Sequence, residues 1–326
     1  MAIGDQIKAL LRSHIEGDDE HFLSVAMQVA AYEAKRGHGK LADELRGLID
    51  EAKARQHVLG AKKPTPIAQP RGDLANLLNA SYPKVRLSDM VLSQGLRTRL
   101  SRIVKEHRQF TKIRSHGLSP RRKLLLIGPP GTGKTMTASA LAGELGLPLF
   151  LVRLDALITK FLGETAAKMR LIFDAATNTR AVYFFDEFDA IASQRGLTND
   201  VGEVRRTLNS FLQMIEQDDS NSLIVAATNH AEILDYAVFR RFDDVVEYEA
   251  PTPELVIETL KSRLGTFISP GFAWKSLANA AASLSYADLT RATQEAIKDA
   301  IIHDRDSVNE NDLLRSFEDR RSIQKR

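Results

Sequence analysis

The first part of the chain carries apolar side chains at helical spacing. These positions recur every three or four residues in three successive stretches, and Gly37-His38-Gly39 separates the second stretch from the third. Such spacing gives each predicted helix one apolar face. Residues 1–58 are therefore predicted to form a module of three short helices around a shared core. The positions that carry this pattern are Ile3, Ile7, Leu10, Leu11, Phe22, Val25, Val29, Tyr32, Leu41, Leu45, Leu48 and Ile49.

The helical pattern then disappears over residues 59–84. The segment contains Pro64, Pro66 and Pro70, together with few large apolar side chains between residues 60 and 72. Proline-rich sequence without apolar periodicity is typical of an extended, poorly packed connection. We predict that residues 59–84 form a linker.

Short apolar runs alternate with helical sequence from residue 85 to residue 250. The runs cover residues 123–127, 149–152, 182–185 and 223–227. Apolar strands separated by helices are typical of a parallel sheet with helices on both faces. After Pro251 and Pro253 only helical periodicity remains. We predict an α/β fold class, with a large α/β domain over residues 85–250 and a small helical domain over residues 251–326.

Composition and charge narrow the functional classes. The 326 residues are 43% hydrophobic and 27% charged, as in an ordinary globular protein. A net charge of +3 is too small to indicate a nucleic-acid partner, and the absence of cysteine excludes disulfides and thiolate metal sites. The N-terminus lacks the apolar core of a secretory signal, and no apolar run is long enough for a membrane span. These features predict a cytoplasmic protein.

A glycine-rich segment follows the first apolar run of the α/β region. Residues 128–135 read Gly-Pro-Pro-Gly-Thr-Gly-Lys-Thr and match the phosphate-loop pattern at every fixed position. Its glycines allow backbone N–H groups to surround phosphates at the N-terminus of the helix predicted to begin at Lys134. Lys134 is expected to reach the β- and γ-phosphates of ATP, and the Thr135 hydroxyl is expected to bind Mg²⁺. The predicted nucleotide-binding residues are Gly128, Pro129, Pro130, Gly131, Thr132, Gly133, Lys134, Thr135, Met136 and Asp186.

Two adjacent carboxylates end the apolar run at residues 182–185. Downstream of a phosphate loop, Asp186 is expected to hold Mg²⁺ through water and Glu187 to act as the general base on the attacking water. Acidic residues after a strand are also common in ordinary loops, but the phosphate loop favours the catalytic interpretation. The two motifs together predict an ATP hydrolase.

These motifs resemble those of the AAA+ ATPases, specifically the classical AAA branch, over about Val85–Arg320. The resemblance implies a phosphate-loop NTPase domain followed by a small helical lid. In that family a polar residue after the next strand positions the attacking water, and Asn229 occupies that place here. Arg240 and Arg241 lie in a segment similar to the one that carries arginine fingers, which act on the nucleotide of the neighbouring subunit. The adjacent form Arg240-Arg241-Phe242 is similar to the microtubule-severing and ESCRT-disassembling branch.

The segment Thr-Lys-Phe-Leu-Gly-Glu, which begins at Thr159, resembles the first pore loop of the same family. The resemblance implies that Phe161 grips an extended polypeptide in the centre of a ring, with Lys160 and Leu162 beside it. A phenylalanine is also an ordinary core residue in helices, but the polar and glycine neighbours favour an exposed loop.

Two segments depart from the family pattern. Ser285-Tyr286-Ala287-Asp288 is similar to the Ser-Gly-Ala-Asp pattern of classical members, which lack the lid arginine that senses the γ-phosphate in other AAA+ proteins. Tyr286 replaces the glycine of that pattern. Residues 87–91 occupy the usual adenine-contacting position without its ordinary glycine. The sequence therefore leaves the contacts to the nucleoside open.

The N-terminal module resembles in layout the microtubule-interacting-and-trafficking type domain of the ESCRT-disassembling ATPases. A module that binds a protein substrate or adaptor and a module for packing or oligomerisation both remain open. Residues 117–123 are similar to the corresponding segment of bacterial ATPases associated with a subtilisin-like protease. This similarity implies a separately encoded protease partner.

The resemblance as a whole implies a ring-forming, Mg-ATP-dependent homo-oligomer, expected to be a hexamer, that remodels, unfolds or translocates protein substrates. The main alternative is a nucleotide-dependent switch that controls a partner such as a protease without threading it. A third hypothesis is a DNA-associated AAA+ protein, and the near-neutral net charge argues against it.

Overall fold

The computed structural model describes residues 69–158, 162–189 and 201–324, together with parts of the segment 25–49. The chain divides into two units, Met1–Thr65 and Pro66–Arg326. In the first unit, the described residues between 25 and 49 are helical except for His38. The rest of the predicted three-helix module lies outside the described residues, so its division into three helices stays a prediction. The buried apolar residues of this unit include Val25, Ala30, Ala42 and Ile49.

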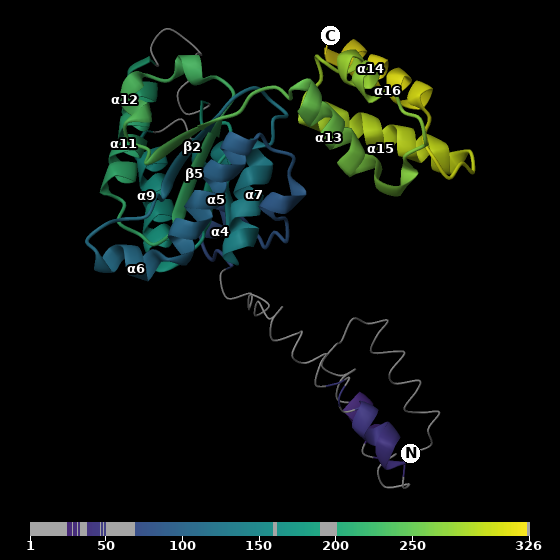
Figure 1. The fold of residues 1–326 in the computed structure, drawn as a ribbon. Coiled ribbons are helices and arrows are strands. Elements are labelled where there is room, and N and C mark those ends of the chain that lie inside the picture. Colours follow the sequence, from purple (N-terminus) through teal and green to yellow (C-terminus); the bar gives the residue numbers. More distant parts are fainter. Residues whose placement is uncertain are drawn as a thin grey trace. The chain divides into compact units, whose positions relative to one another are not determined.

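A six-stranded sheet forms the centre of the second unit (Figure 1). Its spatial order is β1-β3-β4-β5-β2-β6, and every pair is parallel except β1 with β3. The mostly parallel α/β sheet is thus confirmed, and the four predicted strands are its four inner ones. The strands are β1 (Leu78–Ser81), β2 (Lys123–Ile127), β3 (Leu149–Val152), β4 (Val182–Phe185), β5 (Leu223–Thr228) and β6 (Asp244–Glu247).

The predicted linker over residues 59–84 is wrong at its C-terminal end. Residues 74–77 form the short helix α4 (Leu74–Leu77), and β1 pairs with β3 from Leu78 to Ser81. Leu77 and Leu78 are both buried in the core. β1 has only four residues, and one of them is the polar Asn79. Its apolar signal is therefore too short to distinguish it from the proline-rich stretch before it. The sequence pattern also misses β6, because acidic residues at both of its ends interrupt the apolar signal.

Both faces of the sheet are buried under helices, as predicted. Neighbouring residues of an inner strand point to opposite faces. Tyr183 joins a cluster with α9 (Leu162–Asn178) and α11 (Val201–Gln217), and Phe184 joins a cluster with α5 (Gln94–Arg108) and α7 (Lys134–Leu145). Strands buried on both sides need apolar residues at nearly every position, which explains the continuous apolar runs. The helices of this domain are α5 (Gln94–Arg108), α6 (Phe110–Ser115), α7 (Lys134–Leu145), α8 (Leu154–Leu157), α9 (Leu162–Asn178), α11 (Val201–Gln217) and α12 (Tyr236–Phe239), with short 3-10 turns η1 (Leu87–Asp89) and η2 (Ala231–Ile233).

Four helices and a 3-10 turn follow the sheet and form a lid with a core of its own. Leu260, Leu289 and Phe317 are among its buried residues, and each belongs to a different helix. Thr252 caps the first of these helices, and a capping box between Ser285 and Asp288 begins the third. The elements are α13 (Pro253–Leu264), η3 (Gly265–Phe267), α14 (Trp274–Ala280), α15 (Tyr286–Ile302) and α16 (Glu310–Gln324).

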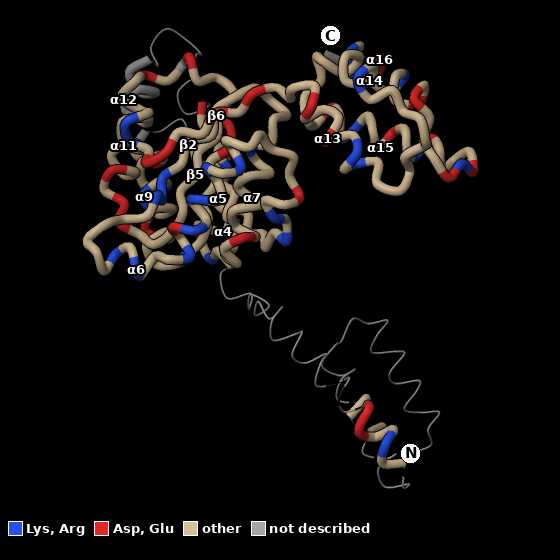
Figure 2. The backbone as a smooth tube through the Cα atoms, in the orientation of Figure 1, with Lys and Arg blue, Asp and Glu red and all other residues tan. Residues whose placement is uncertain are grey.

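Basic and acidic positions are interspersed along the second unit (Figure 2). Even the basic helix α5 is bound to carboxylates of neighbouring elements. Arg99 pairs with Asp244 of β6, and Arg108 pairs with Glu144 of α7 at 2.7 Å. The positive charge of α5 therefore fastens it to the domain. No helix among the described residues has the length and apolar composition that a membrane span needs.

Candidate nucleotide site

The predicted site residues follow three neighbouring parallel strands. The phosphate loop at residues 128–133 follows β2, Asp186 and Glu187 follow β4, and Asn229 follows β5, which lies between the other two. The carboxyl ends of parallel strands meet at one edge of a sheet, where ligands of open α/β sheets bind. The topology thus brings together groups that are far apart in the sequence.

Glycines shape the phosphate loop through close backbone approaches. Gly128 and Gly131 have φ values of 144° and 75°, in a region that favours glycine. A Cβ added to Gly128 would lie 2.3 Å from the Tyr248 carbonyl oxygen, and one added to Gly131 would lie 2.4 Å from Ser285 Oγ. Both glycines are therefore required by contacts with the surrounding protein as well as by backbone conformation.

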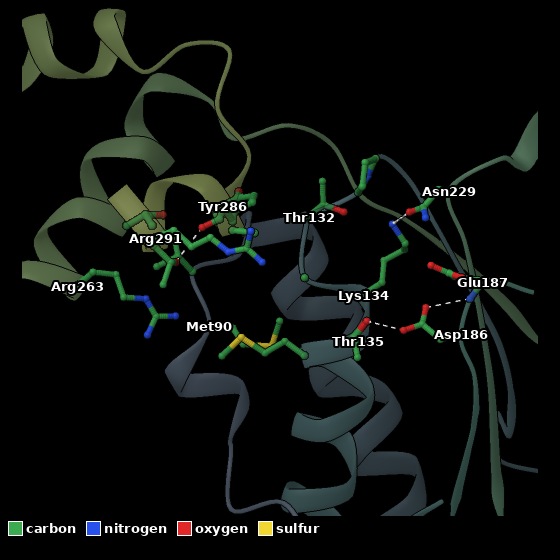
Figure 3. Close-up of a pocket in the computed structure, with 18 residues that line it drawn as sticks. Met90, Thr132, Lys134, Thr135, Asp186, Glu187, Asn229, Arg263, Tyr286 and Arg291 are labelled. Atoms are coloured by element: carbon green, nitrogen blue, oxygen red, sulfur yellow. Dashed lines mark hydrogen bonds between the residues drawn. The ribbon is translucent and has the colours of Figure 1, made fainter. Parts of the chain in front are cut away.

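Lys134 is the first residue of α7, and its ammonium group lies inside the loop (Figure 3). Its Nζ donates to the carbonyl oxygens of Gly128 at 2.6 Å and Pro129 at 2.9 Å, and to Asn229 Oδ1 at 2.7 Å. Burial lowers the pKa of Lys134, and nearby carboxylates such as Asp186 oppose this shift. The charged group sits where β- and γ-phosphates would meet the helix N-terminus.

Hydrogen bonds connect Thr135, Asp186 and Glu187 beside the phosphate loop. Thr135 Oγ1 donates to Asp186 Oδ2 at 2.8 Å, and the Glu187 backbone N–H donates to Asp186 Oδ1 at 3.0 Å. Glu187 has a φ of 50°, an uncommon conformation for a residue with a side chain. Its exposed side chain lines the cavity beside the loop. The backbone thus turns sharply at the residue expected to act as general base.

The donor set fits a magnesium ion. Mg²⁺ in phosphate-loop sites is held by one hydroxyl and one carboxylate, and phosphate oxygens and waters complete its coordination. Thr135 and Asp186 supply such a pair in direct contact. Among the described residues no group of three His, Cys, Asp or Glu side chains forms a separate metal cluster.

A cavity of about 480 Å³ extends from these residues to the lid (Figure 3). The lid end carries two arginines, Arg263 and Arg291, which form no ion pair with a described residue, and Arg263 Nε is buried without a hydrogen-bond partner. Burial raises the pKa of Tyr286, and the neighbouring Glu258 adds to this shift. Helical periodicity alone gave no signal that these faces of α13 and α15 meet the nucleotide loop. The lining residues at this end are Met90, Val91, Thr259, Arg263, Tyr286, Ala287, Thr290 and Arg291.

The lid contacts the phosphate loop directly. The Ala287 backbone N–H in the first turn of α15 donates to the Gly131 carbonyl oxygen at 3.1 Å. The capping box holds this turn in place, with Ser285 Oγ 2.6 Å from Asp288 Oδ2. The hydrogen bond from Ala287 to Gly131 joins the first turn of α15 to the middle of the loop.

A buried layer supports the loop from behind. The Tyr248 hydroxyl donates to Thr137 Oγ1 at 2.6 Å, and Thr137 Oγ1 donates to the Gly133 carbonyl oxygen at 3.1 Å. Burial raises the pKa of Tyr248, so its phenol stays protonated and remains a donor. The chain of hydrogen bonds links the end of β6 to the last glycine of the loop.

Arg240 and Arg241 do not line this cavity. They follow α12, which Figure 1 shows on the flank of the α/β domain away from the lid. The Arg240 guanidinium lies 4.6 Å from the ring centroid of Tyr236, and Arg241 pairs with Glu216 of α11. Lys160 and Phe161 lie outside the described residues, and only the backbone of Leu162 is described, as the first residue of α9.

The sequence has relatives that match this architecture. The family model of the "ATPase family associated with various cellular activities (AAA)" matches residues 124–250. The chain is also 38% identical to the AAA family ATPase y4kL of Sinorhizobium fredii over 321 residues, which cover 98% of this chain and 96% of y4kL. The chain belongs to the AAA family of ATPases. As an AAA ATPase it is an ATP hydrolase with a phosphate-loop NTPase domain.

Two further relatives match about two thirds of the chain. The AAA ATPase is 33% identical to the ATP-dependent zinc metalloprotease FtsH of Helicobacter felis over 235 residues, which cover 69% of this chain and 37% of FtsH. It is 35% identical to the proteasome-activating nucleotidase of Thermococcus onnurineus over 232 residues, which cover 69% of this chain and 58% of the nucleotidase. The chain therefore spans less than two thirds of either of these relatives, and nearly the whole of y4kL.

Proposed function

We propose that this AAA ATPase is a ring-forming, Mg-ATP-dependent motor that remodels, unfolds or translocates protein substrates. The observation that carries the proposal is the position of Arg240 and Arg241, which lie on the flank of the α/β domain, outside the nucleotide cavity of their own chain. Guanidinium groups stabilise the charge of a transferring γ-phosphoryl group when they reach it. Arginines in this position are suited to the nucleotide of another copy, and repetition of that contact closes a ring when the rotation between copies allows it.

Within one chain, the cavity provides the remaining groups for hydrolysis. Lys134 and the loop N–H groups would bind the phosphates. Thr135 and Asp186 would hold the magnesium ion, which neutralises phosphate charge when bound. Glu187 would accept a proton from the attacking water, and Asn229, beside the Lys134 ammonium, would orient that water.

The protein substrate class is supported by the relatives and by one segment of the sequence. The name of FtsH describes an ATP-dependent metalloprotease, the name of the nucleotidase describes activation of the proteasome, and each of them matches 69% of this chain. In the proposed ring, Phe161 grips the polypeptide and Lys160 and Leu162 flank it. The N-terminal unit would bind a substrate or an adaptor, and a separately encoded protease is the partner class to test.

Assembly is tested by the size of the Glu187→Gln variant with and without Mg-ATP, measured by mass photometry. This variant should bind ATP without hydrolysing it, so a nucleotide-dependent ring should accumulate as a species of about six subunits. Lys134→Ala, which removes the phosphate-binding ammonium, is the control and should show no nucleotide-dependent shift. A Glu187→Gln monomer with ATP demonstrably bound would contradict the ring and favour a switch.

Remodelling is tested by the effect of an unfolded protein on ATP turnover. Casein should stimulate the wild-type ATPase, and Phe161→Ala should abolish that stimulation. A switch that does not thread polypeptide would show the same response to casein in the wild type and in Phe161→Ala.

A further inference from the structure

Tyr236 is an unusually exposed aromatic residue. It is the first residue of α12, and its exposed fraction is 71%, although the next buried position of the same helix, Val238, is fully covered. A large aromatic side chain stabilises a fold mainly when it is buried. The position of Tyr236 therefore has no explanation in the core of its own domain.

The ring of Tyr236 instead carries the side chain of Arg240. The guanidinium carbon lies 4.6 Å from the ring centroid, one helical turn further along the chain. A cation held over an aromatic face is attracted by the ring while its N–H donors point outward. Arg240 forms no ion pair with a described carboxylate, so its charge and its donors remain available.

The neighbouring arginine is held differently. Arg241 pairs through its Nη1 with Glu216 near the C-terminal end of α11, so a carboxylate faces its charge and occupies one of its donors. The two adjacent arginines, which the sequence pattern treats as one unit, therefore have different surroundings. One is presented by an aromatic face and the other is fixed to a carboxylate.

We propose that Tyr236 is a positioning residue that presents Arg240 to the nucleotide of a neighbouring copy, and that Arg240 rather than Arg241 contacts the γ-phosphate. This inference rests on the proposed ring function. The aromatic face limits the rotamers of a long and flexible side chain, so less conformational freedom is lost when the guanidinium binds phosphate. Because the Arg240 guanidinium stabilises the charge that develops during γ-phosphoryl transfer, its positioning by Tyr236 is expected to act on turnover and not on ATP binding.

The test compares Tyr236→Leu with Tyr236→Phe in the full-length chain. Both variants are assayed for kcat and KM with Mg-ATP at concentrations where mass photometry shows the same assembly as wild type. Tyr236→Leu removes the aromatic face and should lower kcat about two- to fivefold, the range that an exposed cation–π contact corresponds to, with KM unchanged. Tyr236→Phe keeps the face and should retain the wild-type kcat. Tyr236→Gln serves as a second non-aromatic variant.

A double-mutant cycle with Arg240→Ala separates the possible failures. If Tyr236 acts through Arg240, then adding Tyr236→Leu to Arg240→Ala should lower kcat no further. An additional loss in that background, or loss of assembly in Tyr236→Leu alone, would overturn the positioning role. A wild-type kcat in Arg240→Ala together with a loss in Arg241→Ala would overturn the choice of Arg240. Wild-type turnover in both arginine variants would refute the proposed function itself.

Discussion

The contact between the lid and the phosphate loop makes a specific prediction for Gly131→Ala. Gly131 has a φ of 75°, so an alanine there adopts a left-handed conformation, which costs about 1–2 kcal/mol. Its Cβ would also lie 2.4 Å from Ser285 Oγ and 3.2 Å from Ala287 Cβ. The first turn of α15 must therefore move away, and the hydrogen bond from the Ala287 N–H to the Gly131 carbonyl is lost.

The backbone cost lowers the free energy of unfolding, and the lost hydrogen bond sets the expected change in nucleotide affinity. A hydrogen bond of this kind contributes about 1 kcal/mol, which corresponds to about a fivefold change in an equilibrium constant. Because the lid lines one end of the cavity, we expect this loss to appear in nucleotide affinity. Gly131→Ala should weaken the binding of a fluorescent ATP analogue at least about fivefold and should also lower the free energy of unfolding.

Gly146→Ala is the matched control. Gly146 ends α7 with a φ of 63°, and a Cβ there would meet no atom within 4 Å. It should lower the free energy of unfolding by a similar backbone cost and leave nucleotide affinity unchanged. Ser285→Gly removes the side chain that the new methyl group meets, and a glycine cap costs only a few tenths of a kcal/mol. Equal affinities in Gly131→Ala and Gly146→Ala, or no recovery in Gly131→Ala with Ser285→Gly, would refute the lid contact as the cause.

Three further predictions concern buried polar groups. Tyr248→Phe removes the hydrogen bond to Thr137 and should lower the free energy of unfolding by about 1 kcal/mol in urea titrations; an unchanged midpoint would contradict a supporting role. His107→Gln should flatten the pH dependence of the free energy of unfolding between about pH 7.5 and 5. Burial lowers the pKa of His107, so the unfolded chain binds the proton first as the pH drops. The wild-type protein therefore loses stability as the pH falls through the ordinary histidine range, and the variant lacks this loss. Arg122→Met leaves the carboxylate of Asp218 buried without its ion-pair partner. This variant should lower the free energy of unfolding by about 3 kcal/mol. Adding Asp218→Asn to Arg122→Met should recover part of that cost, and strictly additive losses would show that the pair is not coupled.

The parts of the fold that the sequence predicted are those with a strong local signal. The inner strands are apolar at nearly every position because they are buried on both faces, and the lid helices have a clear helical period. The phosphate loop, Asp186 and Asn229 could be placed because each directly follows one of these strands. Parallel pairing of β4, β5 and β2 then puts their C-terminal ends together without further information.

The parts that could not be predicted depend on tertiary contacts. β1 and β6 are four residues long, and their pairing with β3 and β2 decides their structure more than their own composition does. The roles of Arg263 and Arg291 at the cavity depend on how the lid packs against the loop. Adjacent arginines look equivalent in a sequence, and only the positions of Tyr236 and Glu216 distinguish them. Apart from the C-terminal end of the linker, the domain division stays a prediction, as does the role of Phe161.

The antiparallel edge strand β1 has a mechanical consequence. A tensile load on the chain ahead of residue 69 reaches β1 before it reaches Met90 and Val91 at the nucleotide cavity. After the single-turn helix α4, β1 has one neighbour, β3, and four residues in register, so it is the first strand to peel away. Behind it, Arg86 Nη1 donates to the Gly143 carbonyl oxygen on α7 and holds the chain a second time. The strand that carries the phosphate loop lies four places further into the sheet, so a load from the N-terminal side meets the sheet at its edge before it meets β2.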